Sequence, residues 1–205
     1  MSKSEKETTE GQILEAAKNV FQRKGMDGSR MQEIADEAGI NKALLHYYYR
    51  SKQMLFEAVF KNAFSLMAPQ LNGILNDDST IEDKIRHFTH NYLTFMNKHP
   101  YLPKFIIHEV NRNPEFILNL RNVTGFPNLD KFKKQVESEV ENGTIKPISA
   151  EQLFINIMAL NIFPFIATPL IKAFVNIDDK SFKQLMEDRK TEVADFIIQS
   201  IKVKP

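Results

Sequence analysis

The chain has 205 residues, of which 42% are hydrophobic, and a formal net charge of +1. This length is sufficient to bury the core of one large domain or two small ones. Because the overall charge is so small, nucleic-acid binding would have to come from a local cationic surface. The absence of cysteine excludes disulfides and cysteine-based metal or redox chemistry, and the 7 glycines form no phosphate-cradling loop, so no cofactor is expected.

The N-terminal residues 1–8 are polar, lack the apolar run of a signal peptide and are predicted to be a disordered lead-in, which favours a cytoplasmic protein. One uncharged run, residues 152–171, is long enough to cross a bilayer. It contains two asparagines and two prolines, which are costly in lipid. We therefore interpret it as a buried helix pair at a subunit interface, with a membrane-associated protein as the alternative.

Helical patterns dominate the first quarter of the chain. Thr9 and Gln12 have the spacing of a capping box and predict the start of the first helix, which Gly25 would end. One apolar face of this helix is formed by Ile13, Leu14, Ala17, Val20 and Phe21.

A second capping box, Ser29 with Gln32, predicts a short helix that ends at Gly39. Asn41 is a suitable N-cap for a third helix that runs to about Tyr49.

Ser51 predicts the cap of a fourth helix, which Pro69 should kink or end. We place a domain boundary inside this helix, so that residues 9–57 form an N-terminal module and residues 58–205 a larger helical domain.

The rest of the chain is also predicted to be helical, and the only strand-like stretch, residues 144–148, is interpreted as a connector. The expected helices span residues 81–99, two short segments that begin near Pro103 and Pro114, 127–143, 149–175 and 180–201. The predicted fold class is all-α.

Residues 31–49 have the pattern of a helix-turn-helix. Ala35 lies four residues before Gly39, where two helices cross and a larger side chain would separate them. Leu45 lies six residues after Gly39 and is expected to pack back onto the preceding helix. The third helix would then present Lys42 to the major groove of B-DNA. A helical hairpin without function is the alternative.

The charge pattern favours DNA binding. Between residues 38 and 53 the chain has three basic residues, Lys42, Arg50 and Lys52, and no acidic residue. The helix that begins after Ser51 also offers its N-terminal N–H groups to a phosphate.

The N-terminal module resembles the TetR family of bacterial regulators. The family's first helix has the form Ile-Leu-x-Ala-Ala-x-x-x-Phe, which is found at residues 13–21, and a Lys-Gly turn follows at Lys24-Gly25. The family's next run is matched by Ile-Ala-Asp-Glu-Ala-Gly-Ile at residues 34–40. Residues 41–52, Asn-Lys-Ala-Leu-Leu-His-Tyr-Tyr-Tyr-Arg-Ser-Lys, are similar to its recognition helix.

The resemblance implies a set of DNA-contacting positions. Lys42, Ala43 and Leu44 would lie against base edges, while Tyr47, Tyr48 and Lys52 would reach phosphates. His46 takes the place of a tyrosine that contacts DNA in the family, and Gln32 that of a frequent arginine. The complete predicted set is Ser29, Arg30, Gln32, Lys42, Ala43, Leu44, His46, Tyr47, Tyr48 and Lys52. The departures from the family pattern leave the operator sequence open.

The resemblance also implies a C-terminal domain that binds a small effector and dimerises. Residues 149–175 and 180–201 would form a four-helix bundle in a homodimer, which reads double-stranded DNA at a palindromic operator. An apolar or aromatic effector would then release a repressor. The candidate pocket residues, for which plain core packing is the alternative, are Phe88, Tyr92, Phe105, His108, Glu109, Phe116 and Met158.

Two other interpretations of the chain remain open. A constitutive DNA-binding regulator without an effector would have the same sequence features. A helical enzyme is disfavoured because no cysteine nucleophile, glycine-rich loop or spaced set of metal ligands is present. The four histidines at positions 87, 90, 99 and 108 form no recognisable metal site.

Overall fold

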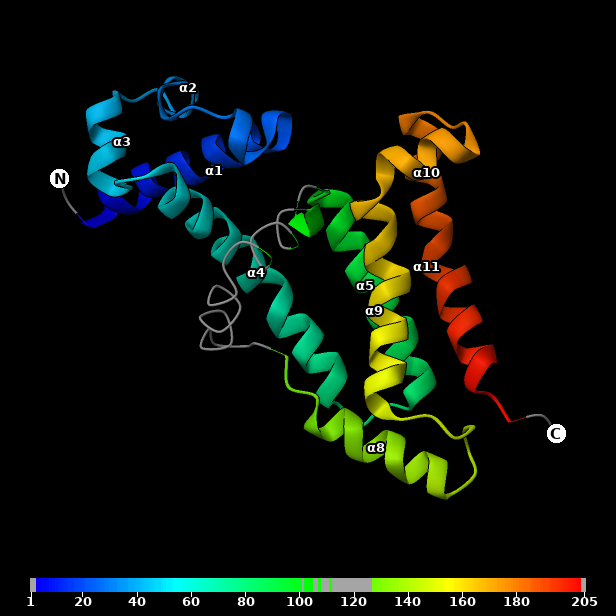
Figure 1. Cartoon of the computed structure of the whole chain (residues 1–205). Coiled ribbons are helices and arrows are strands. Elements are labelled where there is room, and N and C mark those ends of the chain that lie inside the picture. Colours follow the sequence, from blue (N-terminus) through cyan, green and yellow to red (C-terminus); the bar gives the residue numbers. More distant parts are fainter. Residues whose placement is uncertain (1–2, 101, 105–106, 108–110, 112–126, 204–205) are drawn as a thin grey trace. The chain divides into compact units, whose positions relative to one another are not determined.

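The computed structural model describes residues 3–100, 102–104, 107, 111 and 127–203 (Figure 1). These residues form helices and one isolated antiparallel bridge, Ile145 with Lys202, but no strand, so the predicted all-α class is confirmed. The helices are α1 (Lys3–Gly28), α2 (Met31–Glu37), α3 (Lys42–Tyr48), α4 (Lys52–Asn76), α5 (Ile81–Lys98), α8 (Asp130–Glu141), α9 (Ala150–Ile166), α10 (Thr168–Val175) and α11 (Asp179–Ile201).

The chain folds as two compact units, residues 1–65 and 66–205, and the boundary between them in the sequence falls within α4. Of the two effects predicted for Pro69, a kink or an end of the helix, the end does not occur, because α4 continues to Asn76. Proline removes only one backbone hydrogen bond from a helix. The buried side chains of Leu71 and Leu75 supply apolar contacts for the turns that follow Pro69.

The first unit is built on contacts between α1 and α2 and between α2 and α3. The rings of Phe21 and Phe56 lie 4.6 Å apart in its core. Helix α1 begins at Lys3 instead of Thr9, so residues 3–8 extend the helix that was expected to follow a disordered lead-in. Its backbone leaves the helical conformation at Gly25, with φ 69°, as the glycine predicted.

The second unit is organised around α5. Helices α9 and α11 both pack against α5, and α8 packs against α9 (Figure 1). The apolar and neutral residues of α5 that face this core are Ile81, Ile85, Phe88, Thr89, Tyr92, Leu93 and Met96.

The helix predicted over residues 149–175 is divided into α9 and α10, which meet at Ala167 with a bend of 77°. Two prolines near the break leave backbone carbonyls without their helical donors, and side-chain donors take their place. Pro164 cannot donate to the carbonyl of Leu160, which instead accepts a 2.8 Å hydrogen bond from Arg189 of α11. Pro169 likewise frees the carbonyl of Phe165, and the hydroxyl of Thr168 shares its hydrogen between this carbonyl, at 3.0 Å, and that of Pro164, at 2.9 Å.

In the part of the chain that the structure describes, no single helix is long and apolar enough to cross a membrane. The α9–α10 pair reaches that length and composition only when its two bent members are taken together.

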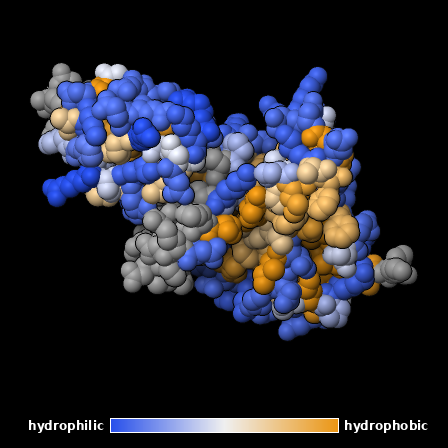
Figure 2. Space-filling model, turned by 45° about the horizontal axis from the view of Figure 1, so that its top comes forward, coloured by the Kyte–Doolittle hydropathy of each residue, from blue (hydrophilic) through white to orange (hydrophobic). Residues whose placement is uncertain are grey.

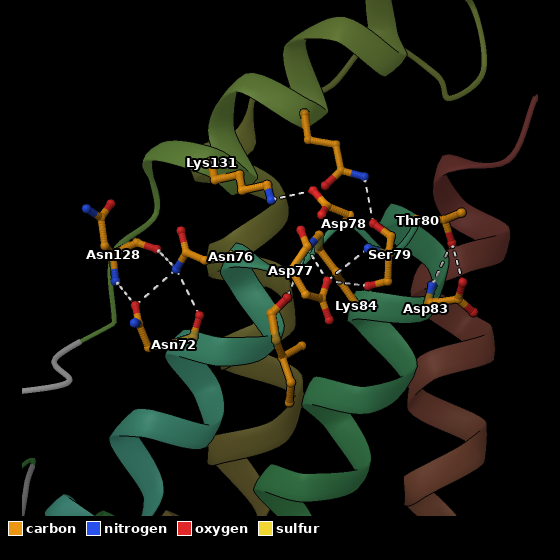
Figure 3. A network of polar contacts seen from close by, with 12 residues as sticks. Asn72, Asn76, Asp77, Asp78, Ser79, Thr80, Asp83, Lys84, Asn128 and Lys131 are labelled. Carbon is orange, nitrogen blue, oxygen red and sulfur yellow. Dashed lines mark hydrogen bonds and ion pairs between the residues drawn. The ribbon is translucent and has the colours of Figure 1, made fainter.

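A buried lysine holds the C-terminal end of α4 (Figure 3). The side chain of Lys84 is 1% exposed, and its ammonium group donates to the carbonyls of Ile74 and Asp77 and to the Asp77 carboxylate, at 3.0, 2.8 and 2.6 Å. Cations at a helix C-terminus satisfy its free carbonyls and oppose its dipole. Lys84 of α5 therefore ties the end of α4 to the loop that follows.

The same loop is also tied to α8. Asn76 donates to the carbonyl of Asn128 at 3.0 Å, and Lys131 forms a 2.6 Å ion pair with Asp78 (Figure 3). Partial burial opposes ionisation of Asp77, but hydrogen bonds from Lys84 and Ser79 outweigh it and lower the pKa of Asp77 to about 2. The loop thus carries a carboxylate that is charged at all but strongly acidic pH.

We expect Lys84→Met to lower the free energy of unfolding by about 1–3 kcal/mol, because it leaves buried carbonyls without a donor. Lys131→Met removes the same charge from an exposed ion pair of this loop and should change the value by less than about 1 kcal/mol. Urea unfolding monitored by circular dichroism measures both, and equal losses in the two variants would contradict the assignment.

Acid should weaken the Lys84 contact. The folded-state pKa of Asp77 lies below its ordinary value of 3.8, so its contribution to stability is complete above about pH 4 and is lost as the pH falls towards 2. The urea midpoint of the wild type should therefore fall more steeply over this window than that of Lys84→Met. Parallel curves for the two proteins would contradict the prediction.

Candidate nucleic-acid interface

The turn between α2 and α3 depends on one glycine. Gly39 has φ 66°, its N–H bonds to the carbonyl of Asp36 at 3.1 Å, and the N–H of Ile40 bonds to the carbonyl of Ala35 at 3.0 Å. No atom lies within 4 Å of the position that a Cβ would occupy on Gly39. The requirement for glycine is therefore conformational, since side-chain-bearing residues rarely adopt this backbone conformation.

The two helices of the motif pack through small and apolar residues, as predicted. Ala35 of α2 and Leu45 of α3 are both 0% exposed, and Ile34 is equally buried. Because Ala35 is this small, α2 and α3 can approach closely at the crossing. Burial of Leu45 fixes which side of α3 faces inward, and this leaves the other side free.

The two predicted N-caps that follow the turn are present. Asn41 accepts a 2.8 Å hydrogen bond from the N–H of Leu44, and Ser51 accepts one from Met54 at 3.1 Å. The capping box predicted at Ser29 is wrong, because the N-cap of α2 is Arg30 and its side chain forms no capping bond.

Both residues of the predicted box have other partners. The hydroxyl of Ser29 is buried and donates to the carbonyl of Gly25, while Gln32 donates to Asp36 one turn further along α2. The Ser29 hydroxyl thus bonds to the carbonyl of Gly25, whose backbone is left-handed, and does not cap α2.

Charged pairs hold α1 against α2. Arg23 makes two hydrogen bonds to Glu37, at 2.8 and 3.2 Å, and Lys24 pairs with Glu33 at 2.5 Å. The bond from Arg23 lowers the pKa of Glu37. Two of the three acidic residues of α2, Glu33 and Glu37, are therefore paired with cations within the unit, while the third, Asp36, accepts a hydrogen bond from the uncharged amide of Gln32.

Tyr49 ends α3 and fastens it to α1. Its ring is 7% exposed, and its hydroxyl donates to Glu10 at 2.8 Å. Burial, together with the Glu10 carboxylate, raises the pKa of Tyr49, so the phenol remains neutral and acts as the donor. This hydrogen bond joins residues that lie 39 positions apart, and no pattern in the sequence predicts it.

The outward side of α3 is polar and cationic. Lys42, Ala43 and His46 are exposed, Leu44 is half-buried, and the side chain of Tyr47 is 67% exposed. These predicted contacts thus lie on one short helix with their functional groups accessible.

Arg50, absent from the predicted contact set, is exposed directly after α3 and forms no ion pair with the described residues. Its position in the basic stretch between residues 38 and 53 was the available signal.

Two predicted phosphate contacts are partly engaged inside the unit. The Tyr48 hydroxyl is buried without a hydrogen-bond partner among the described residues, and its ring packs edge-on against Tyr47 at 5.5 Å. The Lys52 ammonium donates to the carbonyls of Ser29 and Asp27, at 2.9 and 3.3 Å. Lys52 therefore connects the start of α4 to the segment between α1 and α2.

The predicted effector-pocket residues are described only in part. Phe88 and Tyr92 are buried on α5 with stacked rings 5.8 Å apart, and Met158 is half-buried on α9. The other four, Phe105, His108, Glu109 and Phe116, lie outside the described residues. Where the structure is described, no group of three or more histidine, aspartate or glutamate side chains could hold a metal ion.

Comparison with known proteins identifies the N-terminal unit. Residues 13–59 match the family model of bacterial regulatory proteins of the tetR family. The HTH-type transcriptional regulator RutR of Escherichia coli is 25% identical over 149 residues, which cover 72% of this chain and 69% of RutR. A probable HTH-type transcriptional regulator, YttP of Bacillus subtilis, is 27% identical over 107 residues, which is 51% of this chain and about half (52%) of YttP.

Solved structures extend the likeness of fold to the whole chain. A TetR family transcription regulator from Marinobacter aquaeolei aligns with a TM-score of 0.64 at 15% identity, covering 99% of this chain and 100% of that one. A TetR-family regulator from Haemophilus influenzae aligns with a TM-score of 0.60 at 17% identity, covering 97% and 98%. The N-terminal helix-turn-helix unit therefore belongs to the tetR family of bacterial regulatory proteins.

Proposed function

We propose that the protein is a repressor that binds a palindromic operator as a homodimer and leaves it when a small apolar or aromatic molecule binds to the C-terminal region. Residues 9–57 would form the DNA-binding domain and residues 58–205 the effector-binding and dimerisation domain. The main support for this proposal is the position of α3 in the N-terminal unit. Its capped N-terminus and the burial of Leu45 leave the side chains of Lys42, His46 and Tyr47 exposed on the outward side.

The first turns of α3 would read the bases. Lys42 is an exposed donor that can reach guanine acceptors in the major groove, and Leu44 can contact a thymine methyl group. Tyr47, Arg50 and the remaining donor of Lys52 would bind phosphates, which sets register and supplies the salt-dependent share of affinity. Ser29, by contrast, is only 3% exposed, so it would contribute to DNA binding indirectly, by positioning its neighbour Arg30.

Dimerisation would use the exposed apolar side chains of α9, α10 and α11. Figure 2 shows hydrophobic residues gathered on one side of the C-terminal unit, and contiguous exposed apolar surface of this kind marks interaction sites. The most exposed large apolar side chains of α9, α10 and α11 are Ile155, Phe163, Leu170, Phe174, Val175 and Phe196, with exposed fractions between 53% and 81%. A twofold partner would cover this surface and supply the second recognition helix.

Selection of bound duplexes from a random pool tests the operator. A recovered palindrome would support the proposal, and failure to bind any duplex at low salt would refute it. With the selected operator, Lys42→Ala should lose about 1–3 kcal/mol of discrimination at one base position per half-site. The control Lys134→Ala removes the same charge from α8 and should leave specificity and affinity unchanged.

Lys52→Ala should weaken binding to all DNA sequences alike, because it removes one phosphate contact per subunit. The slope of log affinity against log salt concentration should therefore fall by about one per subunit. Competition binding at several salt concentrations distinguishes this from Lys42→Ala. If both variants bind the operator as the wild type does, the contact assignment is wrong.

Phe196→Glu should convert the homodimer into a monomer, because it places a charge in the proposed apolar interface. Met54→Glu adds the same charge at a 48% exposed apolar position of the N-terminal unit and should remain a dimer. Sedimentation velocity reports the mass, and an unchanged dimer for Phe196→Glu would place the interface elsewhere.

Helix α4 contributes residues to both units, so we propose that it carries the effector signal, with Pro69 as its point of reduced stiffness. Pro69→Ala restores one backbone hydrogen bond and should reduce release of the operator by an effector while leaving operator affinity intact. A release assay by fluorescence anisotropy measures both, and an unchanged response would argue against this role.

A further inference from the structure

A polar pair is buried at the packing of α5 against α9. Asn161 and Thr89 are both 0% exposed, and the amide nitrogen of Asn161 lies 3.4 Å from the Thr89 hydroxyl. The same nitrogen donates to the carbonyl of Ile157 at 2.8 Å. Because a backbone carbonyl can only accept, this contact fixes the amide orientation and points its nitrogen towards Ile157.

The other half of the amide has no donor. The Oδ1 atom of Asn161 is buried and finds no hydrogen-bond partner among the described residues. A buried acceptor without a donor is costly, and native proteins retain such a group where something else pairs with it. Replacement of Asn161 by an apolar residue would avoid the cost, so its presence calls for a partner.

Aromatic side chains lie on the same two helices as this acceptor. The rings of Phe88 and Phe154 meet edge-to-face with 6.4 Å between centroids, and Phe88 stacks on Tyr92. Burial raises the pKa of Tyr92, which keeps its phenol neutral. Phe154 and Met158 are half-buried and lie seven and three residues before Asn161, on the same side of α9.

We infer that Asn161 reads the effector: its Oδ1 atom accepts a hydrogen bond from an N–H or O–H group on an otherwise apolar, uncharged aromatic ligand held beside Phe88, Phe154 and Met158. This inference rests on the proposed effector site and names the ligand chemistry that the site selects. An N–H or O–H donor completes the pairing of the amide, whereas a ligand of the same shape without a donor leaves the acceptor unpaired and is rejected.

Two matched pairs of probes test the inference by calorimetric titration: phenol with its methyl ether anisole, and indole with N-methylindole. The wild type should bind the donor-bearing member of a pair about five- to tenfold more tightly, the effect of one buried hydrogen bond. Asn161→Leu should bind both members alike and should unfold at the same or a higher temperature than the wild type, because an unpaired acceptor has been removed.

Thr89→Val is the matched control. It changes the same buried pair but leaves Oδ1 of Asn161 in place, so the preference for phenol or indole should persist. Equal affinity within both pairs in the wild type, no binding of any probe, or an intact preference in Asn161→Leu would overturn the inference. Equal affinity is also the result expected if an internal water satisfies Oδ1.

The operator assay separates this inference from the proposed function. If a donor-bearing probe binds through Asn161 but does not release DNA, the ligand site stands and effector-controlled release fails. If DNA binds and no probe does, the ligand inference fails while the DNA-binding role stands.

Discussion

The left-handed backbone at Gly39, combined with the small buried side chain of Ala35, is the constraint on which the DNA-binding surface depends. The turn brings α3 back against α2 at a distance that only a small residue at the crossing allows. Burial of Leu45 then sets the rotation of α3 about its own axis. A helix of seven residues would have little stability alone, so its orientation comes from this packing and from the Asn41 cap.

Charge is distributed in the first unit by the same packing. Glu33 and Glu37 are paired with Lys24 and Arg23, so two of the three acidic residues of α2 support the fold. Lys52 shares its ammonium between backbone carbonyls and solvent, and therefore combines a structural and an electrostatic role. The chain has a net charge of only +1, yet its basic groups at the end of the motif remain available to phosphates.

In the second unit, interruptions of regular structure are matched by specific donors. Arg189 pairs with the carbonyl that Pro164 frees, Thr168 with the one that Pro169 frees, and Lys84 with the carbonyls at the end of α4. The Oδ1 atom of Asn161 differs from these carbonyls because it is buried without a partner among the described residues, as are the Thr94 hydroxyl and the Nε atom of Arg189. Buried polar groups of this kind are where specificity for a ligand can reside, because an apolar residue would pack there at lower cost.

The sequence by itself determined the all-α class, the helix-turn-helix and its family, because a glycine hinge, side-chain caps and a 3.6-residue apolar period act within a few residues of one another. Only the tertiary structure decided which polar side chains are engaged in contacts within the fold. Ser29, Tyr48 and Lys52 were predicted to contact DNA, and their present partners include a carbonyl, a neighbouring ring and a segment more than twenty residues away. The continuation of α4 past Pro69, the break at Ala167 and the pairing of Asn161 with Thr89 were equally beyond the sequence, since each depends on packing between helices distant along the chain.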